Sequence, residues 1–217
     1  SATGVFANSG ALADYALKEI TRCAENADIT GVKLHLANAQ FDFQNREHVR
    51  TLEEVFQEAA RLDLPIVIHL WTGPDYGSRD ARIFIDEVLA SAPDVTVQIA
   101  HMAGRGSPPE DSARENPMQA FVDASAEQPD LMDEDVVFDL SGAFRSPAGH
   151  EGDTLRTIQA FNERLARHIQ DIGVDHVVFG SDWPALPEPG RSAGTLRSIL
   201  DRQTVESLFD NRAPYVR

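Results

Sequence analysis

The stretch Val177–Pro184, which reads VVFGSDWP, decides the fold that the sequence predicts. Its β-branched and aromatic start is typical of a buried strand, and Gly180 with the following serine marks the carboxyl end of that strand. Because side chains alternate along a strand, Val178, Gly180 and Asp182 share one face. A lone Asp at this place is more often a helix cap or a turn residue. Whether Asp182 is a functional residue therefore depends on which side chains stand at the ends of the other strands.

Two earlier runs end in the same way, each with a histidine. Residues 64–71, LPIVIHLW, form an apolar run that delivers His69 at its end, and residues 95–104, VTVQIAHMAG, deliver His101. One histidine beside an apolar run is usually a hydrogen-bonded core residue. Histidines at equivalent strand ends instead indicate a shared site. Strand alternation leads us to expect His69, His101 and Asp182 on one inward face, converging at one end of a parallel sheet.

Further strands set the size of the sheet. Residues 31–36, GVKLHL, place Lys33 and His35 on one face, residues 136–142, VVFDLSG, do the same with an Asp and a Ser, and a short run is predicted at residues 4–7. Together with the three runs that end in His69, His101 and Asp182, they make six strand-helix units. A complete (β/α)8 barrel has eight units and typically needs ~250 residues. An open doubly wound sheet is the alternative, but its ligands gather at one switch point. Polar residues at nearly every strand end favour the barrel.

The order of these motifs carries a resemblance. FGSDWP, preceded by IVIH, QIAHMAG and GVKLH, resembles the amidohydrolase-related family of metal-dependent (β/α)8 TIM barrels. The resemblance implies a metal-binding histidine on the fifth strand, a catalytic histidine on the sixth and an aspartate on the eighth, which correspond to His69, His101 and Asp182. The His-x-His pair of the family's first strand is absent from the 217 residues. We therefore expect residues 1–217 to form a single α/β barrel domain, N-terminally incomplete, without its first one or two strands.

The resemblance also implies the chemistry of the site. His69 and Asp182 would bind a divalent metal, with Zn²⁺ expected first and Mn²⁺ or another ion as alternatives, while His101 and Asp182 would be catalytic. Imidazole and carboxylate groups are usual ligands of such ions. Lys33 has an alternative interpretation as a carboxylated bridging ligand. Substrate contacts are expected from side chains at the strand ends and in the loops that follow them, namely Lys33, His35, Trp71, Arg105, Arg145 and Trp183.

Three functions remain open at this point. The first is hydrolysis of a small carbonyl or carboxylate compound, such as a lactone, an amide or a carbon–carbon bond, by a metal-activated water. The second is non-oxidative decarboxylation or hydration on the same barrel, which would use the ion to stabilise enolate-like charge. The third, of another class, is a catalytically inactive barrel that binds a ligand or partner. The presence of the upstream histidine pair would favour an enzyme.

Composition restricts the partners. A formal net charge of −16 argues against binding nucleic acid or an anionic membrane through a broad surface field. The sequence has no apolar run near the ~18 residues of a membrane span and no signal segment at its start, so we expect a cytoplasmic location. The single cysteine, Cys23, cannot form an internal disulfide. The expected partner is a small molecule, and a homo-oligomer remains open.

Overall fold

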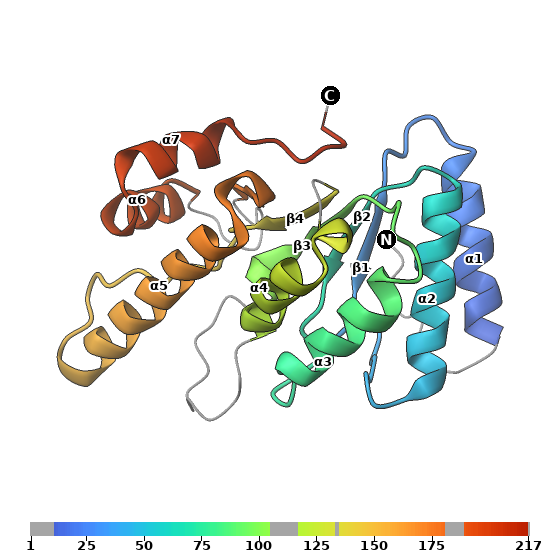
Figure 1. The fold of residues 1–217 in the computed structure, drawn as a ribbon, viewed down its shortest axis with the longest axis horizontal. Helices are drawn as coiled ribbons and strands as arrows, with labels where there is room; N and C mark the ends of the chain where they lie inside the picture. The colour runs from blue at the N-terminus through green and yellow to red at the C-terminus, as the bar shows by residue number, and fades with distance from the viewer. Residues whose placement is uncertain (1–10, 105–116, 133–134, 181–188, 217) are drawn as a thin grey trace.

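The computed structural model describes residues 11–104, 117–132, 135–180 and 189–216. Its centre is a parallel sheet with the strand order β1-β2-β3-β4-β5 (Figure 1). The strands are β1 (Val32–His35), β2 (Ile66–His69), β3 (Val97–Ile99), β4 (Val136–Asp139) and β5 (Val177–Val178). All four neighbouring pairs are parallel.

The strand order distinguishes the two predicted architectures. Each strand pairs with the next one in the chain, so the sheet advances in a single direction, as a barrel wall does. A doubly wound sheet would instead reverse its order at a switch point. Among the described residues no pairing joins β1 to β5, so this wall is open, as expected for an incomplete barrel. The strand predicted at residues 4–7 lies outside the described residues.

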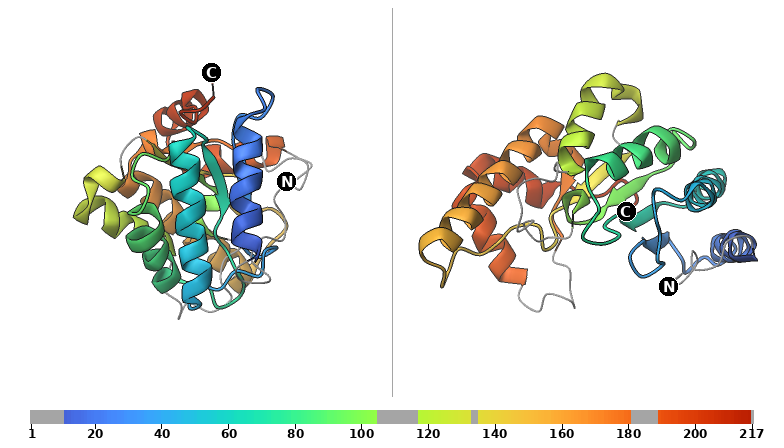
Figure 2. Two further views of the ribbon diagram at one scale, coloured as in Figure 1. Left: turned by 90° about the vertical axis from the view of Figure 1, so that its right-hand side faces the viewer. Right: turned by 90° about the horizontal axis from the view of Figure 1, so that it is seen from below.

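Helices cover one face of the sheet (Figures 1 and 2). The α-helices are α1 (Ala11–Ala24), α2 (Arg46–Arg61), α3 (Ser78–Ile83), α4 (Pro117–Glu127), α5 (Gly152–Ile172), α6 (Pro189–Ile199) and α7 (Arg202–Asp210). Helix α3 continues into the π-helix η1 (Phe84–Leu89), and three short 3-10 turns are η2 (Ala100–Ala103), η3 (Pro129–Leu131) and η4 (Val174–His176). None of the helices in these ranges is long and apolar enough to cross a bilayer.

The core lies between the sheet and these helices. Alternate strand residues such as Ile66, Ile68, Val97 and Ile99 are fully buried against it. Four phenylalanine rings connect the layers, with centroid distances of 5.6 Å, 6.3 Å and 5.2 Å along the series Phe56, Phe84, Phe121 and Phe138. Burying one such side chain contributes about 1.5–3 kcal/mol. This apolar layer fixes which strand face remains for polar residues.

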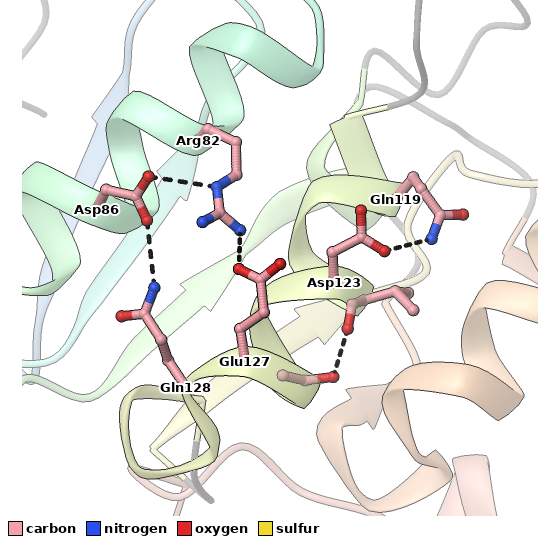
Figure 3. Close-up of polar contacts among 8 residues, drawn as sticks. Arg82, Asp86, Gln119, Asp123, Glu127 and Gln128 are labelled. Atoms are coloured by element: carbon pink, nitrogen blue, oxygen red, sulfur yellow. Dashed lines mark hydrogen bonds and ion pairs between the residues drawn. The ribbon is translucent and has the colours of Figure 1, made fainter.

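A polar network on the outer surface holds η1 and α3 to α4 (Figure 3). Arg82 contacts Asp86 at 3.2 Å and Glu127 at 2.9 Å, and Gln128 donates to the other oxygen of Asp86 at 3.3 Å. Exposed ion pairs of this kind contribute only about 0–1 kcal/mol each. The network therefore orients the two helices and adds little to the stability of the sheet.

Candidate active site

The strand face opposite the helices carries the polar residues. Strand register aligns His35 with His69, and it aligns Gln98 with Val67 and with Val137 on the neighbouring strands. Helix-facing positions of β1 are buried, whereas Lys33 is exposed and His35 half-buried. The prediction that Lys33 and His35 share one face agrees with this alternation.

Three imidazoles meet at the carboxyl ends of β1, β2 and β3. The rings of His35 and His69 stack, with centroids 4.1 Å apart and an angle of 9° between their planes. The rings of His69 and His101 lie edge to face at 4.9 Å. Trp71 follows β2 and stands edge to face with His69 at 6.4 Å. The structure thus brings His35, His69, His101 and Trp71 into one cluster.

His101 reaches this cluster by a route that the sequence analysis did not predict. Strand β3 ends at Ile99, and continued alternation would place His101 on the helix side with Val97 and Ile99. Instead, His101, Met102 and Ala103 have φ values of 56°, 51° and 57°. This left-handed turn redirects the imidazole toward His69. The expectation that strand alternation alone delivers His101 was therefore wrong.

Left-handed backbone is costly for residues other than glycine, at about 1–3 kcal/mol each, and such strain persists only where neighbours enforce it. Here the enforcing group is Asp139 at the end of β4. Its Oδ1 accepts the backbone N–H of His101 at 3.1 Å and that of Ser141 at 3.0 Å. Asp139 is 4% exposed, so these bonds are shielded from water. Strand β4 thereby fixes the turn that carries His101.

Burial and nearby positive charge lower the pKa of two of these imidazoles, those of His35 and His69. Desolvation, followed by the charges of His35, His101 and Lys33, lowers the pKa of His69 to about 3. Desolvation and then Lys33 also lower the pKa of His35 below its usual value. A neutral imidazole keeps a ring lone pair that can bind a metal ion. At neutral pH, His69 is therefore in the protonation state that a ligand requires.

One buried atom of this cluster has no hydrogen-bond partner among the residues that the structure describes. Nε2 of His69 is buried and makes no hydrogen bond in the part of the chain that the structure describes. A buried polar atom without a partner costs about 1–3 kcal/mol. A divalent cation fits this donor, because imidazole nitrogen is among its common ligands. Within the same residues no three His, Cys, Asp or Glu side chains are arranged to hold an ion by themselves, so the coordination would need further ligands.

The remaining predicted site residues are Arg145, which lies in a loop after β4, and three residues that the structure does not describe. Arg145 sits in the loop after β4, where its N–H donates to Asn162 at 3.0 Å and its C=O accepts from the same side chain at 2.8 Å. These bonds tie the loop to α5. Asp182, Arg105 and Trp183 lie outside the described residues, so the predicted convergence of Asp182 with the two histidines is not tested.

The segment after β5 approaches the site closely at Gly180. A Cβ atom on Gly180 would lie 3.0 Å from Cβ of Ser141 and 3.5 Å from Cβ of Asp139. The first distance is shorter than ordinary van der Waals contact. Gly180 therefore packs directly on Asp139 at the end of β4 and on Ser141 in the loop that follows, the two residues that contact His101.

Two residues with evident roles in this site were missed by the sequence analysis. Gln98 donates to Oδ2 of Asp139 at 2.7 Å, and Tyr215 contacts the amide oxygen of the same glutamine. Gln98 shares the inward strand face, which is a signal that alternation could have supplied. Tyr215 lies 117 residues from Gln98 in sequence, and no local pattern marks it.

Comparison with known proteins places this geometry in a family. A family model described as amidohydrolase matches residues 2–209. No curated protein matches the chain significantly in sequence. Among solved structures, 2,6-dihydroxybenzoate decarboxylase from Rhizobium has a TM-score of 0.55 at 16% identity, covering 91% of this chain and 65% of its own.

Two other solved structures are similar to the same degree. A protein from Pseudomonas putida assigned as a 2-pyrone-4,6-dicarboxylic acid hydrolase has a TM-score of 0.52 at 16% identity, covering 87% of this chain and 64% of its own. A 5-carboxyvanillate decarboxylase from Novosphingobium aromaticivorans, complexed with manganese and 4-hydroxy-3-methoxy-5-nitrobenzoic acid, has a TM-score of 0.53 at 14% identity, covering 93% and 59%.

At such identities these structures show the fold, which is the TIM barrel of metal-dependent hydrolases and decarboxylases. The chain spans 59–65% of the length of these three structures. The open parallel sheet is therefore part of a barrel wall, as the strand pattern predicted. Because the family model covers nearly the whole sequence, the chain belongs to the amidohydrolase family.

Proposed function

We propose that this chain carries part of the active site of a divalent-metal-dependent enzyme that acts on a small carbonyl or carboxylate compound, with hydrolysis as its leading reaction. The observation that carries the proposal is the buried Nε2 of the neutral His69, at the centre of the imidazole cluster, which has no hydrogen-bond partner in the described ranges of the chain. Family members generally use a divalent metal, and one similar structure contains manganese. Zn²⁺ and Mn²⁺ are both candidates.

Each side chain has a role in this proposal. His69 would hold the ion together with Asp182 and further ligands, and the bound ion would lower the pKa of a water molecule toward ~7. His101, next to His69 but held by Ser141, transfers a proton to or from the reacting group. Lys33 lies on the same strand face as His35 and brings positive charge to that face, which suits a substrate carboxylate.

Decarboxylation is the second candidate, because two of the similar structures are decarboxylases of hydroxylated benzoates. Both reactions need a carboxylate or carbonyl group held near a proton donor, and the imidazole cluster serves either. A reaction without water attack would use His101 to protonate the ring carbon that loses carbon dioxide. The reaction product therefore distinguishes the two functions.

The test is a turnover assay with the full-length protein, stripped of metal and then loaded with Zn²⁺ or Mn²⁺. One arm offers 2-pyrone-4,6-dicarboxylate and follows ring opening, and the other offers 2,6-dihydroxybenzoate and follows release of carbon dioxide. We expect metal-dependent turnover in one arm, its loss in His69→Ala, and retention in His150→Ala, which changes an exposed loop histidine.

If neither substrate class is turned over with either metal, while the loaded protein is folded, the enzymatic proposal is wrong. A binding barrel would then show ligand-induced stabilisation without product. The single domain over residues 1–217 and the cytoplasmic location stay predictions, and the oligomeric state stays open.

A further inference from the structure

We propose that Asp139 is a positioning residue that acts through Ser141 and fixes His101 in the tautomer with its hydrogen on Nδ1, leaving Nε2 to accept a proton. Only the use of His101 in proton transfer rests on the proposed function. The tautomer itself follows from contacts within the chain.

Counting protons at Ser141 gives the tautomer. Nδ1 of His101 contacts the backbone carbonyl oxygen of Ser141, and it lies 3.0 Å from the hydroxyl oxygen of the same residue. A carbonyl oxygen carries no hydrogen, so Nδ1 must donate to it. The Ser141 hydroxyl also contacts Oδ1 of Asp139, and its single hydrogen goes to that carboxylate. The hydroxyl can then only accept from His101. Both contacts therefore require the hydrogen on Nδ1.

Four donors hydrogen-bond to the Asp139 carboxylate. Oδ1 accepts from the N–H groups of His101 and Ser141 and from the Ser141 hydroxyl, while Oδ2 accepts from Gln98 at 2.7 Å. A carboxylate offers about four acceptor sites, two on each oxygen, so these donors occupy Oδ1 fully and Oδ2 in part. The same carboxylate thus holds the backbone of His101 through one bond and orients its ring through Ser141.

A second layer orients Gln98. The hydroxyl of Tyr215 donates to its amide oxygen, and this directs the amide nitrogen toward Asp139. Tyr215 belongs to the segment that follows α7, at the carboxyl end of the chain. The order of contacts is therefore Tyr215, Gln98, Asp139, Ser141 and His101. Mutating a residue that hydrogen-bonds to an active-site side chain typically lowers activity by about 10–100-fold.

The first test is the ring tautomer, read by ¹⁵N NMR of histidine-labelled full-length protein, with and without Zn²⁺. The resonances of His101 are assigned by their loss in His101→Gln. We expect a hydrogen on Nδ1 and a bare Nε2. A hydrogen on Nε2 of neutral His101 would overturn the proposal. This measurement needs no turnover, so it stands apart from failure of the proposed function.

The second test uses variants on the active protein. Asp139→Asn is expected to lower kcat by about 10–100-fold with little change in KM. In a Ser141→Ala background the same change should cost clearly less, because both act on one ring. Additive effects, or an unchanged kcat in Asp139→Asn, would contradict the proposal.

Tyr215→Phe provides the measurement if Asp139→Asn fails to fold. Removing one hydroxyl at the far end of the series should shift the ring ¹⁵N resonances of His101. The matched control is Tyr15→Phe, which removes the hydroxyl of an exposed tyrosine on α1 and should leave those resonances unchanged. If Tyr215→Phe and wild type gave equal spectra, Tyr215 and Gln98 would not contribute to the orientation of His101.

Discussion

Replacing His69 by leucine should stabilise the metal-free protein while abolishing its function. In the folded chain His69 is buried, its Nε2 has no partner in the described residues, and its pKa is lowered to about 3. Leucine has a similar volume and no polar atom to desolvate. Removing an unsatisfied buried polar atom should therefore raise the free energy of unfolding at neutral pH by about 1–2 kcal/mol.

The pH dependence sharpens this prediction. An unfolded histidine has a pKa of about 6.5, so between about pH 6.5 and pH 3 the unfolded chain binds a proton at His69 that the folded chain does not. Stability of the wild type consequently falls as the pH falls through that window. At pH 5 the loss attributable to His69 is about 2 kcal/mol, and it depends little on the folded pKa as long as that value stays below about 4.

The assay is urea unfolding of metal-free wild type and His69→Leu at about pH 8 and pH 5. We expect the variant to be the more stable protein at both values, with an advantage that grows by about 2 kcal/mol at the lower pH. Other groups titrate in both proteins and cancel in the difference. A variant that is less stable than wild type, or an advantage independent of pH, would refute the burial of a neutral, unsatisfied His69.

Three further variants test neighbouring parts of the site. Gly180→Ala should cost about 1–3 kcal/mol by urea unfolding and lower kcat, because its methyl group would lie 3.0 Å from Cβ of Ser141. Unchanged values in both assays would exclude close packing of Gly180 on Ser141. Lys33→Ala should raise KM and leave kcat nearly unchanged in steady-state kinetics. The reason is that an exposed cation that binds a substrate carboxylate stabilises the bound substrate and the transition state equally. A selective fall in kcat would instead show that Lys33 takes part in the chemical step. Asp182→Asn under saturating metal should reduce kcat by more than about 10²-fold with the circular dichroism spectrum preserved; wild-type kcat would make this residue a loop cap.

The sequence was sufficient for the fold class because the relevant signals are local. Apolar runs with period two, separated by amphipathic helices, specify parallel strands. Alternation also predicted correctly that Lys33 and His35 share one face, whereas the stacking of His35 on His69 was not predicted. Helix boundaries were less predictable. The segment that starts as α3 is α-helical only to Ile83 and continues as the π-helix η1. Hydrophobic periodicity does not reveal this change, because it carries little information on backbone hydrogen-bond spacing within a helix.

The internal contacts of the site could not be predicted in the same way. His101 reaches its place through three left-handed residues, none of them glycine, and that conformation is imposed by Asp139 from another strand. Tyr215 meets Gln98 across 117 residues. Tertiary contacts of this kind override local backbone preference. They could not be predicted from the local sequence, because they depend on which strands are neighbours in the sheet.

The most direct test of the metal site is titration of metal-stripped, full-length protein with Zn²⁺ by calorimetry, comparing wild type, His69→Gln and His150→Ala. Glutamine retains polarity and size but lacks the imidazole lone pair. We predict one tight site in wild type and His150→Ala, with affinity reduced more than about 100-fold in His69→Gln, beyond the effect usual for residues behind a ligand. Equal affinity in all three proteins would contradict the assignment of His69 as a metal ligand and with it the proposed active site.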